Sequence, residues 1–308
     1  MRRAALVAAL AAALVLPGCS QPEEPRQPQV VVTTNILGDV VQQVLGNQAE
    51  VTTLMQPNAD PHSFEISARD AALMGSADLV VSNGLGLEEG LQQHLDRAAA
   101  AGAPMLVAGD AITAIPYGSG DAEGTPDPHF WTDPTAMIKV VDALEESARN
   151  IEGIDPARLA AGAEAYRQQL AALDADMAQA FAAIPDGRRA LVTNHHVFGY
   201  LAKRFDFRVV GAVIPGGTTL AAPGAGDLRQ LSEAIRQAGV PTIFAESSQP
   251  DRLVQVLASE AGVNVQVAAL FTESLSGPGG AAPTYLDMMR ANTGRIVHGL
   301  TASPHPTP

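Results

Sequence analysis

A single long amphipathic segment divides this 308-residue chain into two halves and constrains its fold more than any other feature. In residues 156–184, apolar side chains recur mostly at steps of three and four and so share one helix face; they are Leu159, Tyr166, Leu170, Leu173, Met177 and Phe181. Asp155 and Pro156 provide an N-cap and a proline in the first turn, and residues 185–187 end the segment. A helix of about 30 residues is about 40 Å long, so we expect it to bridge two compact lobes.

Short apolar runs lie on both sides of this segment, and each predicts a β-strand. They are continuous rather than alternating, which is typical of parallel strands covered on both faces; they occupy residues 30–34, 51–55, 79–83, 105–108, 190–194, 208–213, 242–246 and 263–270. Helical patterns intervene at residues 36–45, 68–76, 87–100, 134–150, 197–205, 225–238, 252–261 and 283–298. The alternation predicts α/β lobes with parallel sheets at 29–155 and 185–302, joined by the 156–184 helix and followed by a tail at 303–308.

The first 19 residues are typical of a signal peptide. Arg2 and Arg3 precede an apolar run at 4–16 that is too short to span a bilayer. The run ends in Leu-Pro-Gly-Cys, which resembles a bacterial lipobox, so we expect Cys19 to carry a lipid. The alternative is an ordinary signal peptide with an incidental cysteine. The polar, proline-rich residues 20–28 suit an extended tether between membrane and folded domain.

Charge and composition exclude several functions. The formal net charge is −14 and the chain has two lysines, Lys139 and Lys203, so we expect no nucleic-acid partner. One cysteine excludes an intrachain disulfide and a cysteine-rich zinc finger. Residues 83–88 contain GxG after a strand but lack the third glycine of a dinucleotide fingerprint. The sequence contains no P-loop, GxSxG or HExxH motif.

Histidines and one carboxylate follow several of the predicted strands. His62 and His129 each stand in an Asp-Pro-His sequence, His195 and His196 directly follow the 190–194 run, and Glu273 follows the last strand. Ligands bind at the carboxyl edge of open α/β sheets. Two lobes facing each other would bring these residues together in the cleft between the lobes. Three imidazoles and one carboxylate suit a four-ligand Zn²⁺ site.

Other polar residues fit this site less well. Glu246 follows the 242–246 strand, and we expect it either to hold an imidazole from outside the ligand set or to act as a helix N-terminal acid. His94, His298 and His305 lack a comparable position and are not expected to bind metal. Trp131 is expected to pack beside the site.

The sequence around these residues resembles the zinc/manganese solute-binding proteins of bacterial ABC transporters. The resemblance runs from about residue 29 to 300 and is carried by five motifs in order. These are NADPHSFE at 58–65, ADLVVSNGLGLE at 77–88, DPHFWTDP at 127–134, TNHHVFGY at 193–200 and LFTESLS at 270–276. It implies two α/β lobes joined by one long helix, with one metal ion between them.

The resemblance also implies a ligand set. By position, the family's ligands fall on His62, His129, His195 and Glu273. Two features depart from the family: Asp is common where His196 stands, and Asp is usual where Glu273 stands. Because adjacent residues at a strand end point in different directions, we expect His195 rather than His196 to bind. The histidine-rich loop of many zinc members is absent, since residues 117–125 are short and contain no histidine.

These observations predict capture of Zn²⁺ outside the cytoplasm and its delivery to a membrane permease, without turnover. Manganese members tend to have Glu at the third ligand position, so a third imidazole favours zinc, with Mn²⁺ as the alternative. Affinity should fall as the pH drops through about 6–7 and protons compete for the imidazoles. We expect a monomer in the periplasm or at the cell surface, with a metallochaperone as a further partner. The rival hypotheses are a zinc hydrolase with an open water position and an adhesin whose metal only stabilises the fold.

Overall fold

The computed structural model describes residues 26–118, 122–214, 216–220, 224–247, 252–260 and 266–302. The expected signal peptide with Cys19, residues 20–25 of the tether, and the 303–308 tail lie outside the described residues. The described end of the tether contacts the first lobe, because the Arg26 guanidinium pairs with Asp78 at 2.6 Å. In the described part of the chain, no helix is both long and apolar enough to cross a membrane.

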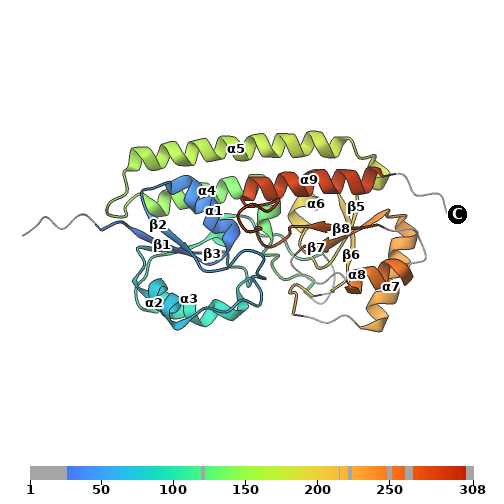
Figure 1. The fold of residues 1–308 in the computed structure, drawn as a ribbon, viewed down its shortest axis with the longest axis horizontal. Helices are drawn as coiled ribbons and strands as arrows, with labels where there is room; N and C mark the ends of the chain where they lie inside the picture. The colour runs from blue at the N-terminus through green and yellow to red at the C-terminus, as the bar shows by residue number, and fades with distance from the viewer. Residues whose placement is uncertain are drawn as a thin grey trace, which may run out of the picture.

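The first lobe is a parallel four-stranded sheet with helices on both faces (Figure 1). Its strand order is β2-β1-β3-β4, and its strands are β1 (Gln29–Val32), β2 (Glu50–Thr53), β3 (Leu79–Ser82) and β4 (Met105–Val107). Val30 and Val32 of β1 face one layer of the core and Val31 faces the other, as expected of a strand covered on both sides. The helices are α1 (Asn35–Leu45), α2 (Ala68–Ser76), α3 (Gln92–Ala100) and α4 (Pro134–Ala148).

The second lobe repeats this architecture. Its sheet is also parallel, and its order β6-β5-β7-β8 is the order of the first lobe with every strand number raised by four. The strands are β5 (Ala190–Thr193), β6 (Arg208–Ala212), β7 (Thr242–Glu246) and β8 (Gln266–Leu270). The helices are α6 (Gly199–Phe205), α7 (Ala225–Ala238), α8 (Arg252–Glu260) and α9 (Tyr285–Thr301). The fold is therefore the expected pair of parallel α/β lobes.

The long helix α5 (Pro156–Ala182) runs across both lobes (Figure 1). The Asp155 carboxylate caps it by accepting the Ala157 N–H at 2.8 Å. Its buried residues are the predicted stripe with Ala163 added. The helix ends two residues before the predicted end at Ile184, because the residue before a proline disfavours helical geometry and Pro185 follows Ile184.

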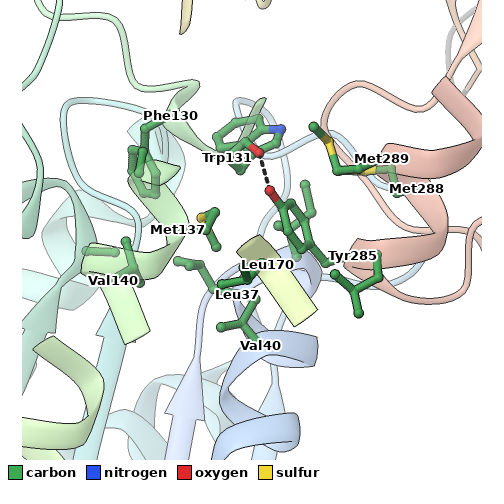
Figure 2. Close-up of a cluster of buried hydrophobic side chains, with 14 of the residues drawn as sticks. Leu37, Val40, Phe130, Trp131, Met137, Val140, Leu170, Tyr285, Met288 and Met289 are labelled. Atoms are coloured by element: carbon green, nitrogen blue, oxygen red, sulfur yellow. Dashed lines mark hydrogen bonds between the residues drawn. The ribbon is translucent and has the colours of Figure 1, made fainter. Parts of the chain in front are cut away.

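A continuous hydrophobic core lies between α5 and the two sheets and includes residues from both lobes. Figure 2 shows part of it, where Tyr285 of α9 packs among side chains of the first lobe. The Tyr285 hydroxyl donates to the Trp131 carbonyl at 2.7 Å. Gly162 of α5 lies directly against the Val44 carbonyl of α1, with no room for a side chain. The lobes are thus joined by shared packing as well as by the chain connection.

The helix predicted at residues 87–100 begins later than expected, because a turn precedes it. The pattern at 87–100 predicts one helix, but a short 3-10 turn at Glu89–Leu91 precedes α3. Before it, Gly84, Leu85 and Gly86 all have positive φ, which forms a tight turn after β3. The buried Glu88 carboxylate closes that turn by accepting the backbone N–H groups of Asn83 and Gly84.

Candidate metal centre

Four buried side chains converge on one point between the lobes. The Oε1 atom of Glu273 lies 2.9 Å from Nε2 of His62, 3.1 Å from Nε2 of His129 and 3.0 Å from Nε2 of His195. The three imidazole rings form a nearly equilateral triangle with centroid separations of 5.7, 5.9 and 5.4 Å. All four ligand atoms lie within 4.8 Å of one another. This is the only such group of histidine, cysteine and acidic side chains in the described residues.

The distances from the Glu273 oxygen to the three imidazole nitrogens are close to those around a tetrahedral ion. Zinc lies about 2.0–2.2 Å from nitrogen and oxygen ligands, so tetrahedral ligand atoms are about 3.3–3.5 Å apart. The observed distances from Nε2 to Oε1 are a few tenths of an ångström shorter. The Glu273 oxygen must therefore move a few tenths of an ångström away from the imidazole nitrogens for an ion to bind between them.

The parallel topology places the four residues. His62 follows β2, His129 lies between β4 and α4, His195 follows β5 and Glu273 follows β8. Each therefore lies beyond the carboxyl end of a strand, two in each lobe, where the two sheets face each other. Burial at this junction is nearly complete, since the four residues are at most 3% exposed.

The charges in this cluster support one another in the metal-free protein. Burial alone would raise the pKa of the Glu273 carboxyl, but the imidazoles of His195, His129 and His62 hold it well below its ordinary value. Burial alone would lower the pKa of His129, but the Asp127 and Glu273 carboxylates raise it to about 9. At neutral pH the site therefore holds an ionised Glu273 and a protonated His129.

Asp127 orients the His129 ring, a role that was not predicted from the sequence. Its Oδ1 accepts the His129 backbone N–H at 2.9 Å and the ring Nδ1–H at 2.7 Å. A carboxylate on Nδ1 leaves Nε2 to face the metal position and makes that nitrogen a stronger ligand. Gly199 makes room for it, because a methyl group there would lie 2.5 Å from Asp127 Oδ2.

The Asp-Pro-His sequence has the same backbone geometry at both sites where it occurs. Asp60 Oδ1 accepts the His62 backbone N–H at 2.9 Å, just as Asp127 does for His129. An aspartate that bonds to the backbone two residues later forms an Asx turn. The signal that could have identified both aspartates was therefore the repeated motif itself.

The segment that carries Glu273 is fixed by residues of both lobes. In the first lobe, the Trp131 indole N–H donates to the Thr272 carbonyl at 2.7 Å, and the Asn35 amide oxygen accepts the Leu275 N–H at 2.9 Å. In the second lobe, Glu246 accepts the Thr272 N–H at 3.1 Å. Glu246 thus supports the backbone beside Glu273, and Trp131 is a packed hydrogen-bond donor.

His196 faces a different environment from His195. His195 is fully buried in the cluster, whereas His196 is half-buried and lines a neighbouring cavity of about 350 Å³ with Tyr117 and Asp127. Burial and the adjacent His195 lower the pKa of His196, so its ring is neutral at pH 7. The structure separates the two histidines as expected for adjacent residues at a strand end.

The glycine-containing turn after β3 supports the His129 loop. The Glu88 carboxylate accepts the Thr33 hydroxyl at 2.7 Å in addition to the two backbone groups that close the turn. The Asn83 side chain then donates to the Pro128 carbonyl, directly before His129, at 3.1 Å. This motif therefore has a structural role next to the candidate site.

Comparison with known families gives one match to nearly the whole folded chain. The family described as zinc-uptake complex component A, periplasmic, matches residues 30–299. This range covers all strands but the first residue of β1, and it contains His62, His129, His195 and Glu273.

Individual relatives have different metals in their names. The zinc-binding protein TroA of Treponema pallidum is 31% identical over 278 residues, covering 89% of each chain. The manganese-binding lipoprotein MntA of Bacillus subtilis is 29% identical over 97% of this chain and 100% of its own. The iron-binding protein YfeA of Yersinia pestis is 28% identical over 88% of this chain and 86% of its own.

Solved structures have the same fold. The periplasmic zinc-binding protein TroA from Treponema pallidum superimposes with a TM-score of 0.83 at 30% identity, covering 90% of this chain and all of that one. The Mn-bound periplasmic metal-binding protein from Candidatus Liberibacter asiaticus superimposes with a TM-score of 0.79 at 25% identity, over 89% of this chain and 99% of its own.

Proposed function

This chain belongs to the ZnuA family of metal-binding solute receptors of ABC transporters, and we propose that it captures Zn²⁺ outside the cytoplasm and delivers it to an importer. The observation that carries the proposal is the convergence of three imidazole nitrogens on one carboxylate oxygen, within 3.1 Å. His62, His129, His195 and Glu273 are the proposed ligands. The receptor acts by binding and release and catalyses no reaction.

Zinc is favoured by the donor types. Three neutral nitrogens and one oxygen suit Zn²⁺, whereas Mn²⁺ prefers a larger share of oxygen ligands. The general affinity order of divalent ions also places Zn²⁺ above Mn²⁺ at such a site. The relative named for zinc and the relative named for manganese are similarly close in sequence, so identity alone does not choose the metal.

Competition calorimetry on the soluble domain tests the choice of metal. The protein is loaded with Mn²⁺ and titrated with Zn²⁺, and the reverse titration is the control. We expect one Zn²⁺ to displace one Mn²⁺ and to bind at least about 100-fold more tightly, in line with the affinity order. Equal affinities, or Mn²⁺ displacing Zn²⁺, would contradict the zinc assignment and support a manganese receptor.

Zinc binding should release a proton at neutral pH. The metal-free protein holds a proton on Nε2 of His129, because carboxylates raise its pKa to about 9, and the ion must displace it. We therefore expect about one proton released per Zn²⁺ at pH 7.5, and an apparent affinity that rises about tenfold per pH unit from 7 towards 9. Protons therefore compete with zinc for His129 at a higher pH than the range of about 6–7 expected for ordinary imidazoles.

Calorimetry in two buffers of different ionisation enthalpy measures this proton directly. Asp127→Asn is the control, because it removes the carboxylate that contributes most to raising the pKa of His129. In that variant the released proton should fall well below one at pH 7.5. A wild type that releases no proton would show that His129 is already neutral in the metal-free protein.

The proposed setting follows from the family and the N-terminal sequence. An ABC permease and its ATPase would receive the ion, and a metallochaperone is a further proposed source of metal. MntA, which aligns with 97% of this chain, is named a lipoprotein. We propose that Cys19 carries a lipid here too and that the receptor works as a monomer in the periplasm or at the cell surface.

A further inference from the structure

A short segment of the second lobe contacts both metal-ligand loops of the first lobe. Residues 216–220, here named the latch segment, lie between β6 and α7. We propose that the latch segment controls the rate at which the bound ion leaves, and that Thr219 is the positioning residue through which it acts. The proposal rests on the proposed function, because it describes release from the same site.

The first contact of the latch segment fixes the His62 loop. The Thr219 hydroxyl donates to Asp60 Oδ2 at 2.5 Å, while Asp60 Oδ1 accepts the His62 backbone N–H at 2.9 Å. One carboxylate therefore links the second lobe to the backbone of a proposed ligand. Hydrogen bonds to a charged acceptor are short and about twice as strong as neutral ones.

The second contact lies beside His129. The Tyr117 hydroxyl donates to the Gly217 carbonyl at 3.0 Å and lies 3.4 Å from Nδ1 of His129. The approach depends on Gly217, because a methyl group there would lie 2.9 Å from the Tyr117 ring.

These contacts affect release because the four proposed ligands are buried. The side chains of His62 and Glu273 are only 1% and 3% exposed, and those of His129 and His195 are fully buried, so a ligand loop must move before an ion can leave. The first lobe contributes two loops to the site, those that carry His62 and His129, and the latch segment forms a hydrogen bond with each. Displacing Asp60 or Tyr117 together with its loop therefore breaks a bond to residues 216–220.

Replacing Thr219 with valine removes the hydroxyl and keeps the side-chain shape. Loss of an outer contact to a metal ligand typically costs about 10- to 100-fold in affinity. We expect Thr219→Val to accelerate zinc dissociation by about tenfold or more, measured by stopped-flow mixing of the zinc-loaded protein with an excess of a chelating dye. Thr219→Ser keeps the hydroxyl and should restore the wild-type rate.

Thr218→Val is the matched control. It is the same substitution in the same segment, but among the described residues the one hydrogen bond of the Thr218 hydroxyl is from the nearby Leu220 N–H, at 3.3 Å. The Thr218→Val dissociation rate should equal that of wild type, and circular dichroism of metal-free Thr219→Val should show an unaltered fold. A wild type that releases zinc slowly together with an unaltered rate in Thr219→Val would overturn the latch alone. A wild type that releases zinc within the mixing time would overturn the latch and the proposed function together.

Discussion

Replacing His195 with alanine should weaken Zn²⁺ binding by about 100- to 1,000-fold while leaving the fold intact. Zinc bound by four protein side chains gains about 10–16 kcal/mol in total. One of four ligands therefore contributes about 3 kcal/mol, and each 1.4 kcal/mol is a factor of ten in affinity. His62→Ala and His129→Ala should have effects of the same size. Chelator competition measures the affinity, and circular dichroism of the metal-free protein checks the fold.

His196→Ala is the matched control for that substitution. The two histidines are adjacent in sequence, but only the His195 ring lies in the cluster with Glu273, at 3.0 Å. We expect His196→Ala to keep the affinity within about tenfold of wild type, which is the smaller end of the effect of an outer residue. If His196→Ala has the larger effect, the choice within the pair is reversed. Near-unchanged affinity in all three ligand variants would refute the site.

Glu273→Gln should be equally damaging, for a reason that is mainly electrostatic. Glu273 is the one carboxylate among the four converging side chains, and its Oε1 lies within hydrogen-bonding distance of all three imidazoles. The amide keeps the size of the side chain but removes the charge that balances the ion. We expect a loss of about 100- to 1,000-fold in zinc affinity, as for any other of four ligands.

Glu273→Asp separates the effect of the negative charge on zinc affinity from the effect of side-chain length. Aspartate keeps the carboxylate on a side chain one methylene shorter than that of Glu273. We expect an affinity within about tenfold of wild type, comparable with altering an outer contact. Wild-type affinity in Glu273→Gln would show that the carboxylate does not bind the ion directly. A larger loss in Glu273→Asp than in Glu273→Gln would show that reach matters more than charge.

The periodic parts of this fold were predictable because local sequence determines them. The apolar stripe on α5 depends on spacing alone, and β7, α2 and α7 begin and end where their patterns predicted. The convergence of four side chains was also predictable, because parallel strands bring their carboxyl ends to one edge. Turns were less predictable. The turn after β3, with its positive φ angles, delays the start of the helix expected at 87–100. This turn is closed by the Glu88 carboxylate, which accepts a backbone N–H.

The supporting contacts of the site could not be predicted, because they join residues far apart in the chain. Asp60 and Thr219 are 159 positions apart, and Asn35 and Leu275 are 240 apart. Such pairs carry no periodic signal and depend on how the lobes meet. Asp127 is the exception, since it stands two residues from His129 and an Asx turn is a local pattern.

The core that the two lobes share beneath α5 limits how a membrane permease could distinguish the metal-loaded receptor from the empty one. A wide rotation of one lobe relative to the other would separate side chains that pack continuously between the lobes, including Tyr285 against the first lobe. Loaded and empty receptors should therefore have almost the same outline. A permease that discriminates between them would have to read the shape and charge of a few surface loops near the cleft. Selective docking would then depend on the local conformation of these loops. Small-angle scattering should find the same radius of gyration for the metal-loaded and metal-free forms.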